Sequence, residues 1–202
     1  MRGNQMKIDA LTVGPIQTNC YIVYNEGAEE AVVIDPGAEA EKIKAALDGK
    51  RAAAVLLTHG HFDHTGALHA FADIPIYLHP SDDVMPLDPV WSAGTMIGDD
   101  APRPAATNYV QEGNKLHLAG LDIAVMHTPG HTLGSVCYAI GDALFTGDTM
   151  FCGGYGRTDL PGGDEMSLAK SLRRLLREEK DWIICPGHGG PSTMEEEKEK
   201  YF

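Results

Sequence analysis

The short segment Thr58-His59-Gly60-His61-Phe62-Asp63-His64 limits the possible folds of this chain more than any other. It places four potential metal donors within six consecutive residues. His59 and His61 are two residues apart, so in an extended turn both rings point to one side. Asp63 and His64 follow at the expected start of a helix and can point elsewhere. A single tetrahedral or five-coordinate ion cannot easily use all four donors of so short a loop. The string therefore predicts a pair of ions, each of which takes two of these donors.

Three further donors share a second context, directly after an expected strand and beside a glycine that lets the backbone turn sharply. They are His131, Asp148 and His188, and a glycine precedes each of them. Loops that project from rigid strands are where functional sites are usually built. The complete candidate donor set is His59, His61, Asp63, His64, His131, Asp148 and His188.

Seven donors of these types match two metal ions that share a carboxylate. Imidazole suits Zn²⁺ or Fe²⁺, and the carboxylates extend the choice to Mn²⁺, so we expect two divalent ions, zinc first. A structural zinc site is disfavoured, because such sites prefer thiolates and none of the four cysteines is placed for one. We expect the cysteines to be reduced, buried thiols of a cytoplasmic protein. Cys152, which closely follows Asp148, has a role near the site as its alternative.

Both halves of the chain show short strands followed by a helix. In the first half, strands are expected at 7–13, 19–24, 31–34 and 53–57, and helices at 39–47 and 64–71. In the second half, strands are expected at 115–118, 122–127, 135–140, 143–146 and 182–185, and a helix at 165–178 that Asp164 can cap. The simplest packing is two sheets face to face with helices outside.

The segment 85–107 interrupts this rhythm with four prolines and two glycines. These residues predict an insertion that consists mainly of loops. We expect a packed surface loop there, with a lid that brings Trp91 near a substrate as the alternative.

The length and the net charge of the chain indicate how many domains it forms and which classes of binding partner are disfavoured. The 202 residues suit one domain, 1–202, and the net charge of −13 disfavours nucleic acid and anionic membranes, which need a dense basic face. Part of the acidity lies in the tail 195–199, which reads as a solvated helix face. The first five residues form no apolar signal core, and no apolar run reaches the length of a membrane span.

At this point the residues resemble the metallo-β-lactamase superfamily and, within it, the short glyoxalase II-like (hydroxyacylglutathione hydrolase-like) branch. The resemblance covers nearly the whole chain, from Val33-Ile34-Asp35-Pro36-Gly37 to Pro186-Gly187-His188-Gly189. It implies a four-layer αβ/βα sandwich. It also implies that His59, His61 and His131 hold the first ion, that Asp63, His64 and His188 hold the second, and that Asp148 bridges both. Asp35 matches the family's buried aspartate that supports the histidine loop from behind; a plain turn residue before Pro36 is the alternative.

The stretch 151–163 is similar to the segment after the bridging aspartate in short glyoxalase II-like proteins. The resemblance makes Arg157 a candidate for binding a substrate carboxylate, with a structural salt bridge as the alternative. It makes Tyr155 a candidate for lining the pocket, with simple packing as the alternative. Full-length glyoxalase II enzymes carry a further C-terminal helical domain that contributes to glutathione binding, whereas only 14 residues follow His188 here. The resemblance to the family therefore supports a metal site in this chain better than it supports specificity for glutathione.

The function implied by the resemblance is metal-dependent hydrolysis of a thioester, such as an acyl-glutathione or a related small molecule. Two divalent ions supply an activated water at neutral pH, and Asp63 would orient it. A thiolate leaving group has an unperturbed pKa near ~8.5 and needs little help from a general acid.

Three other functional classes are compatible with the sequence. The first is a mononuclear iron dioxygenase that acts on a glutathione persulfide, and the second is a lactonase or phosphodiesterase of the same fold. The third is a metal-binding or redox scaffold without turnover. A β-lactamase role is disfavoured by the missing signal peptide and by the pairing of His64 with Asp148. The oligomeric state is not encoded in any pattern that we can interpret.

Overall fold

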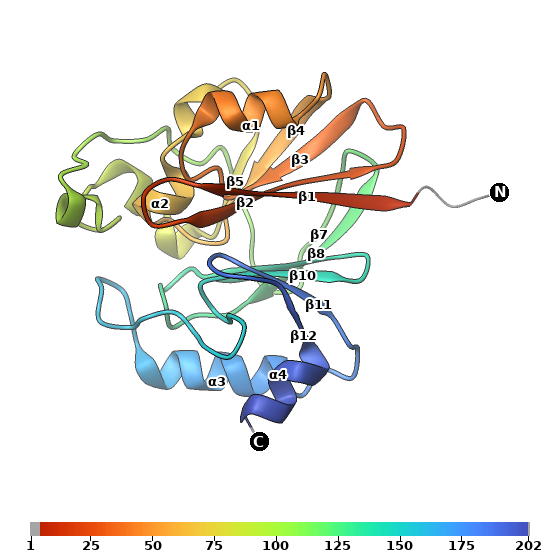
Figure 1. The fold of residues 1–202 in the computed structure, drawn as a ribbon. Helices are drawn as coiled ribbons and strands as arrows, with labels where there is room; N and C mark the ends of the chain where they lie inside the picture. Colours follow the sequence, from red (N-terminus) through yellow and green to blue (C-terminus); the bar gives the residue numbers. More distant parts are fainter. Residues whose placement is uncertain (1–4, 202) are drawn as a thin grey trace.

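Two six-stranded sheets face each other and carry helices on their outer surfaces in the computed structural model, which describes residues 5–201 (Figure 1). The first sheet has the order β1 (Met6–Val13), β2 (Thr18–Asn25), β3 (Glu30–Ile34), β4 (Arg51–Leu56), β5 (Ile76–Leu78) and β6 (Asn108–Tyr109). The second has the order β12 (Ser192–Thr193), β11 (Ile183–Pro186), β10 (Ala143–Gly147), β9 (Val136–Ile140), β8 (Leu121–His127) and β7 (Lys115–Leu118). Both sheets mix parallel and antiparallel pairs.

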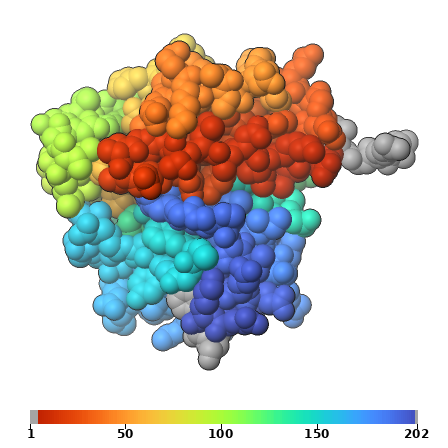
Figure 2. Space-filling model, in the orientation of Figure 1, coloured from red at the N-terminus to blue at the C-terminus, as the bar shows by residue number. Residues whose placement is uncertain are grey.

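The helices complete a four-layer αβ/βα sandwich. Helix α1 (Ala40–Ala46) covers the first sheet, and α3 (Glu165–Leu175) and α4 (Met194–Tyr201) cover the second (Figure 1). The short helix α2 (Phe62–Thr65) and four 3₁₀ turns lie in the connections: η1 (Leu68–Phe71), η2 (Pro80–Asp82), η3 (Met85–Leu87) and η4 (Gly94–Ile97). The expected architecture is confirmed. The N-terminal half of the chain forms one side of the molecule and the C-terminal half the other (Figure 2).

Alternation along the central strands builds the layers. In β3, Val33 packs toward α1, whereas Val32 and Ile34 pack between the two sheets. In β9, Tyr138 lies between the sheets and Cys137 packs toward α3. Because successive side chains point to opposite faces and both faces are covered, these strands read as continuous apolar runs. The buried strands form a rigid base for the loops at their ends.

Most predicted elements are found with shifts of a residue or two at their ends. Asp164 caps α3 as expected, because its side chain accepts a hydrogen bond from the Ser167 amide at 2.6 Å. The helix expected over 64–71 is instead divided into α2 and η1. A Cβ at Gly66 would lie 2.2 Å from the Gly37 carbonyl oxygen, so the chain passes too closely here for another residue type. The short strands β5 and β6 were not predicted.

Two expectations about side chains are wrong. Glu197 is fully buried rather than solvated, and it accepts hydrogen bonds from the Gly153 amide and from Lys200 Nζ, both at 2.8 Å. The contact with Gly153, which no local pattern indicates, ties α4 to the loop after β10. Cys20, Cys137 and Cys185 are buried as expected, but Cys152 is exposed because it lies in the surface turn of that loop.

Residues 1–4 and 202 lie outside the described part of the chain, and the expectation about a leader segment rests largely on them. Within residues 5–201, no helix combines the length and apolar character that crossing a membrane would require.

Candidate metal centre

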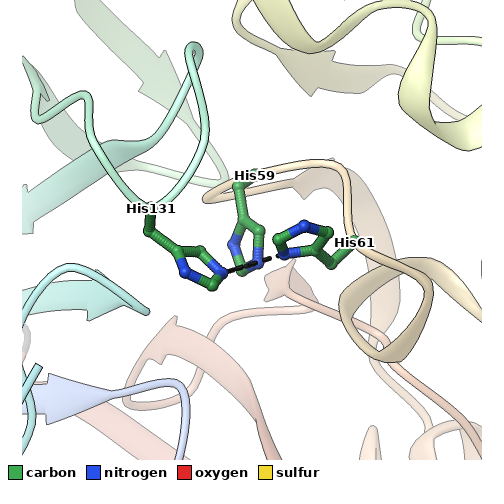
Figure 3. A group of neighbouring side chains, drawn as sticks. All are labelled: His59, His61 and His131. Atoms are coloured by element: carbon green, nitrogen blue, oxygen red, sulfur yellow. Dashed lines mark hydrogen bonds between the residues drawn. The ribbon is translucent and has the colours of Figure 1, made fainter. Parts of the chain in front are cut away.

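The seven candidate donors come from both halves of the chain and meet at one end of the two sheets. Three histidines form the first group, which is drawn in Figure 3. His61 Nδ1 lies 2.9 Å from His131 Nε2, and the same His131 nitrogen lies 3.2 Å from His59 Nε2. All three rings are buried. Three ring nitrogens therefore converge on a single point shielded from water.

The second group contains Asp63, His64 and His188. Asp63 Oδ2 lies 3.3 Å from His64 Nε2 and 3.2 Å from His188 Nε2. Asp148 stands between the two groups. Its Oδ1 is 3.3 Å from His64 Nε2, and its Oδ2 is 3.5 Å from His131 Nε2 and 3.6 Å from His188 Nε2. The structure thus brings all seven residues together and gives Asp148 contact with both groups.

The electrostatics of this cluster favour cations. Burial, and then the neighbouring His131, lowers the pKa of His61 to about 3, and burial also holds the pKa of His59 well below its ordinary value. Both rings are therefore neutral at pH 7 and keep a lone pair for a ligand bond. Burial opposes ionisation of Asp63, yet His64 and His188 hold the pKa of this carboxyl well below its usual range. The first donor group thus offers neutral imidazoles beside ionised carboxylates. Burial opposes protonation of His64 and His188, yet the facing carboxylates raise the pKa of both rings, so a metal ion would have to displace a proton there.

Unsatisfied polar atoms give a direct test of whether a metal fits. Buried polar groups in proteins nearly always have a hydrogen-bond partner. Here His64 Nε2 and Asp148 Oδ1 face each other, are buried, and have no hydrogen-bond partner among residues 5–201; within the same residues His61 Nε2 also lacks one. A divalent cation would satisfy the facing pair, and nitrogen and carboxylate oxygen are donors that Zn²⁺, Fe²⁺ and Mn²⁺ accept. The residues present fit a metal centre.

Asp35 lies directly behind this centre, between the first and second groups. Its Oδ1 accepts a hydrogen bond from the Thr58 amide at 2.8 Å, and its Oδ2 accepts one from Thr58 Oγ1 at 2.7 Å and lies 2.9 Å from His64 Nδ1. The carboxylate therefore accepts a hydrogen bond from His64 Nδ1, and the ring is oriented so that Nε2 faces Asp63 and Asp148. This geometry agrees with the supporting role that the family resemblance implies, which stays a prediction.

The ring of His131 is oriented by a main-chain group that sequence reasoning missed. Its Nδ1 donates to the carbonyl oxygen of Arg157 at 2.7 Å, so Nε2 faces the other histidines. The loop that carries Arg157 is itself held by a hydrogen bond from the Gly156 amide to the Asp148 carbonyl at 3.0 Å. Main-chain carbonyls are present at every residue, so no sequence signal could have singled this one out.

A second buried carboxylate, Asp82 in η2, was also missed. It accepts hydrogen bonds from the Gly60 amide at 3.2 Å, from the Gly134 amide at 2.7 Å and from Thr132 Oγ1 at 2.7 Å. Gly60 lies between His59 and His61, whereas Thr132 follows His131. Asp82 therefore joins the two loops of the first donor group, which come from opposite halves of the chain. Nothing in the local sequence Pro80-Ser81-Asp82 distinguishes it from an ordinary helix-capping turn.

Replacing Asp82 by Ala is expected to loosen the first donor group. The change leaves two amides and one hydroxyl without their buried acceptor, so we expect the free energy of unfolding to fall by about 2–4 kcal/mol. Metal affinity should fall by about 10- to 100-fold, as is typical when a group that orients a ligand is lost. Chemical denaturation and competition with a chelator measure the two effects. The exposed Asp73→Ala variant is the control, and equal behaviour of the two variants would contradict this role.

A cavity of about 330 Å³ opens over the donors. Ala93, Met96 and Ile97 of the insertion form part of its wall, whereas Trp91, the residue considered for a lid, is absent from the lining. In Figures 1 and 2 the insertion, coloured yellow-green, projects at the same end of the molecule as the light-blue segment around residue 160. The insertion expected at 85–107 therefore borders the site, but it does so through Ala93, Met96 and Ile97 and not through Trp91.

The two candidate substrate residues have different positions. Arg157 lines the cavity, yet its guanidinium is bound to Asp159 through Nε–Oδ1 and Nη2–Oδ2 contacts of 2.6 and 2.7 Å. Tyr155 does not line this cavity; it is about half exposed and lines a separate hollow beside Leu168 and Leu172 of α3. The chain reverses between Phe151 and Gly154, directly before Tyr155. Phe151 lines the cavity instead.

Comparisons with known proteins agree with this geometry. A family model described as the metallo-beta-lactamase superfamily matches residues 13–188. Hydroxyacylglutathione hydrolase GloC of Haemophilus influenzae is 35% identical over 96% of this chain and 95% of its own. The crystal structure of the BLEG-1 B3 metallo-beta-lactamase is 35% identical, with a TM-score of 0.89 and coverage of 96% and 97% of the two chains. That of TTHA1623 in a di-iron-bound form is 38% identical, with a TM-score of 0.83 and coverage of 94% and 96%.

Proposed function

Because this chain belongs to the metallo-beta-lactamase superfamily, we propose that it is a metal-dependent hydrolase that cleaves thioesters at a two-metal centre. The observation that carries the proposal is the position of Asp148, whose carboxylate lies beside His131 of the first donor group and beside His64 and His188 of the second. Two relatives add support. One is named a hydroxyacylglutathione hydrolase, and the solved structure of another is titled as a di-iron-bound form.

The proposed ligands follow the two donor groups. His59, His61 and His131 would hold one ion, Asp63, His64 and His188 would hold the other, and Asp148, which lies beside both groups, would be a ligand shared by them. Zinc is the metal proposed first, with iron or manganese as alternatives. When bound, two such ions supply an activated water at neutral pH and a Lewis acid for the carbonyl oxygen of the substrate.

The chain's own residues position the reactants. Asp63 Oδ2 accepts a hydrogen bond from Thr18 Oγ1 at 2.8 Å, which fixes the carboxylate at the mouth of the cavity. We assign to Asp63 the task of orienting the attacking water toward the acyl carbon. The departing thiolate is a weak enough base to leave with little protonation. The apolar wall above the donors excludes bulk water from the carbonyl while it reacts.

β-Lactam hydrolysis is the second candidate, favoured by the likeness to a solved B3 metallo-beta-lactamase. It needs the same attack of water on a carbonyl carbon. The sequence alone disfavours β-lactam hydrolysis. A dioxygenase with a single iron would use only one of the two donor groups. Such a site would not account for the contact between Asp148 and His64.

Metal analysis together with turnover tests the proposal. The protein is loaded with zinc, iron or manganese and assayed with acyl thioesters, lactones, phosphodiesters and β-lactams. We expect two metal ions per chain and the fastest turnover with a thioester, measured as release of thiol. A chelator should abolish this turnover and fresh metal should restore it. One iron per chain with consumption of oxygen, or a clear preference for β-lactams, would refute the proposal.

A further inference from the structure

Apart from the candidate ligands and Arg157, the wall of the cavity over the metal centre carries no polar side chain among the described residues. Besides His61, Asp63, His131, Asp148 and His188, the described lining consists of Gly156, Arg157 and seven apolar side chains. Three of these are large and exposed, with exposed fractions of 44% for Ile16, 61% for Met96 and 51% for Ile97. Single exposed apolar residues are ordinary on protein surfaces, but several gathered around one cavity indicate a surface that binds something apolar.

These side chains reach the cavity from separate connections. Ile16 lies between β1 and β2, Met96 and Ile97 lie on η4, and Leu160 lies in the segment that follows Arg157. Local packing within one connection does not explain why apolar residues of three connections line the same cavity. The cavity volume of about 330 Å³ is at the small end for ligand sites, which is enough for a short acyl chain.

The charge of the wall points to the same kind of substrate. Within the described lining, Arg157 is the one cationic side chain that is not a candidate ligand. Its guanidinium already forms a two-point pair with Asp159, at 2.6 and 2.7 Å. This pairing uses the Nε and Nη2 edge, one of the two edges through which a guanidinium binds a carboxylate. The pair contributes no net charge, so an anionic acyl group meets no free cation beside the donors.

We infer that the site takes thioesters of short, uncharged, apolar acyl groups, and that Asp159 determines this specificity by occupying Arg157. The inference rests on the proposed thioester hydrolysis and names its substrate class. The main chain of Arg157 is fixed at the cavity wall by the hydrogen bond from His131. Removing the Asp159 charge therefore releases the guanidinium at a place from which it can bind an anion in the cavity.

Binding of two thioethers that cannot be hydrolysed tests the inference apart from turnover. S-butyl-N-acetylcysteamine presents an apolar chain. S-(3-sulfopropyl)-N-acetylcysteamine presents an anion that pairs with guanidinium but is a poor metal ligand. Calorimetry on the metal-loaded protein should show tighter binding of the butyl compound. In Asp159→Asn, affinity for the sulfopropyl compound should rise about tenfold while affinity for the butyl compound stays unchanged.

Two further variants make the result specific. Asp142→Asn removes the same charge from another exposed ion pair, with Lys180 at 2.9 Å, and should leave both affinities unchanged. Asp159→Asn combined with Arg157→Met should lose the gain for the sulfopropyl compound. Equal binding of both compounds by the natural protein, or an unchanged affinity ratio in Asp159→Asn, would overturn the inference. Failure to hydrolyse any thioester, with the expected binding order retained, would instead refute the proposed reaction.

Discussion

His59→Ala is expected to lower kcat/KM for thioester hydrolysis by at least about 10³-fold, because the loss of a direct ligand exceeds the 10- to 100-fold effect typical of a residue that only orients one. His59 belongs to two groups of converging donor atoms, one with His61 and His131 and one with His64 and Asp148. The ring is fully buried, so no neighbouring water can replace it without a rearrangement. We expect the bound metal content to fall in parallel with activity.

Metal analysis and steady-state kinetics on the same sample measure this effect. His117→Ala is the matched control, because the His117 side chain is 72% exposed and pairs with Asp122 on the surface. Circular dichroism establishes that both variants remain folded. Turnover retained by His59→Ala at full metal content would exclude the proposed centre as the site of the reaction.

Asp35→Asn is expected to remove metal from the second donor group while the fold is kept. Asp35 has a left-handed backbone with φ of 51°, which asparagine also tolerates. The amide nitrogen of asparagine donates where the carboxylate accepted. If the new amide faces His64 Nδ1, that nitrogen becomes an acceptor, and the ring proton moves to Nε2. A protonated Nε2 cannot bind a metal ion, so activity should fall by about 10- to 100-fold or more.

The alanine variant at the same position separates the two roles of this residue. Asp35→Ala loses the acceptors of the Thr58 amide, the Thr58 hydroxyl and His64, and we expect the free energy of unfolding to fall by about 3–5 kcal/mol. Asp48→Asn is the control, because Asp48 is exposed and has a similar φ of 49°. Full metal content in Asp35→Asn would show that this carboxylate does not set the proton position on His64.

Features encoded in neighbouring residues could be predicted from the sequence. The apolar runs at 31–34 and 135–140 indicated buried strands, and these became β3 and β9 between covered faces. The string from His59 to His64 indicated a two-ion loop because its donor types and spacing restrict how an ion can be held. Short β5 and β6 were missed because two or three residues carry too little periodicity to indicate a strand.

Features that depend on long-range packing could not be predicted. Asp82 contacts residues 22 and 52 positions away, and its neighbours in sequence resemble an ordinary turn. Glu197 stands in an acidic run, yet a contact with Gly153, 44 positions away, buries it. Tyr155 lines a hollow beside α3, whereas Arg157, two residues later, lines the cavity over the donors. Each of these outcomes follows from which surfaces meet after the sheets pack.

The amino-acid sequence by itself determined most of the strands and helices, the donor chemistry and the family, because residue type and near spacing control backbone preference and ligand character. Only the tertiary structure decided which donors share a group, since His59 and His131 are 72 positions apart and meet only when the two sheets face each other. The same packing decided that Arg157 faces the cavity already paired with Asp159. Convergence of side chains depends on the relative placement of distant backbones, and no local pattern contains that information.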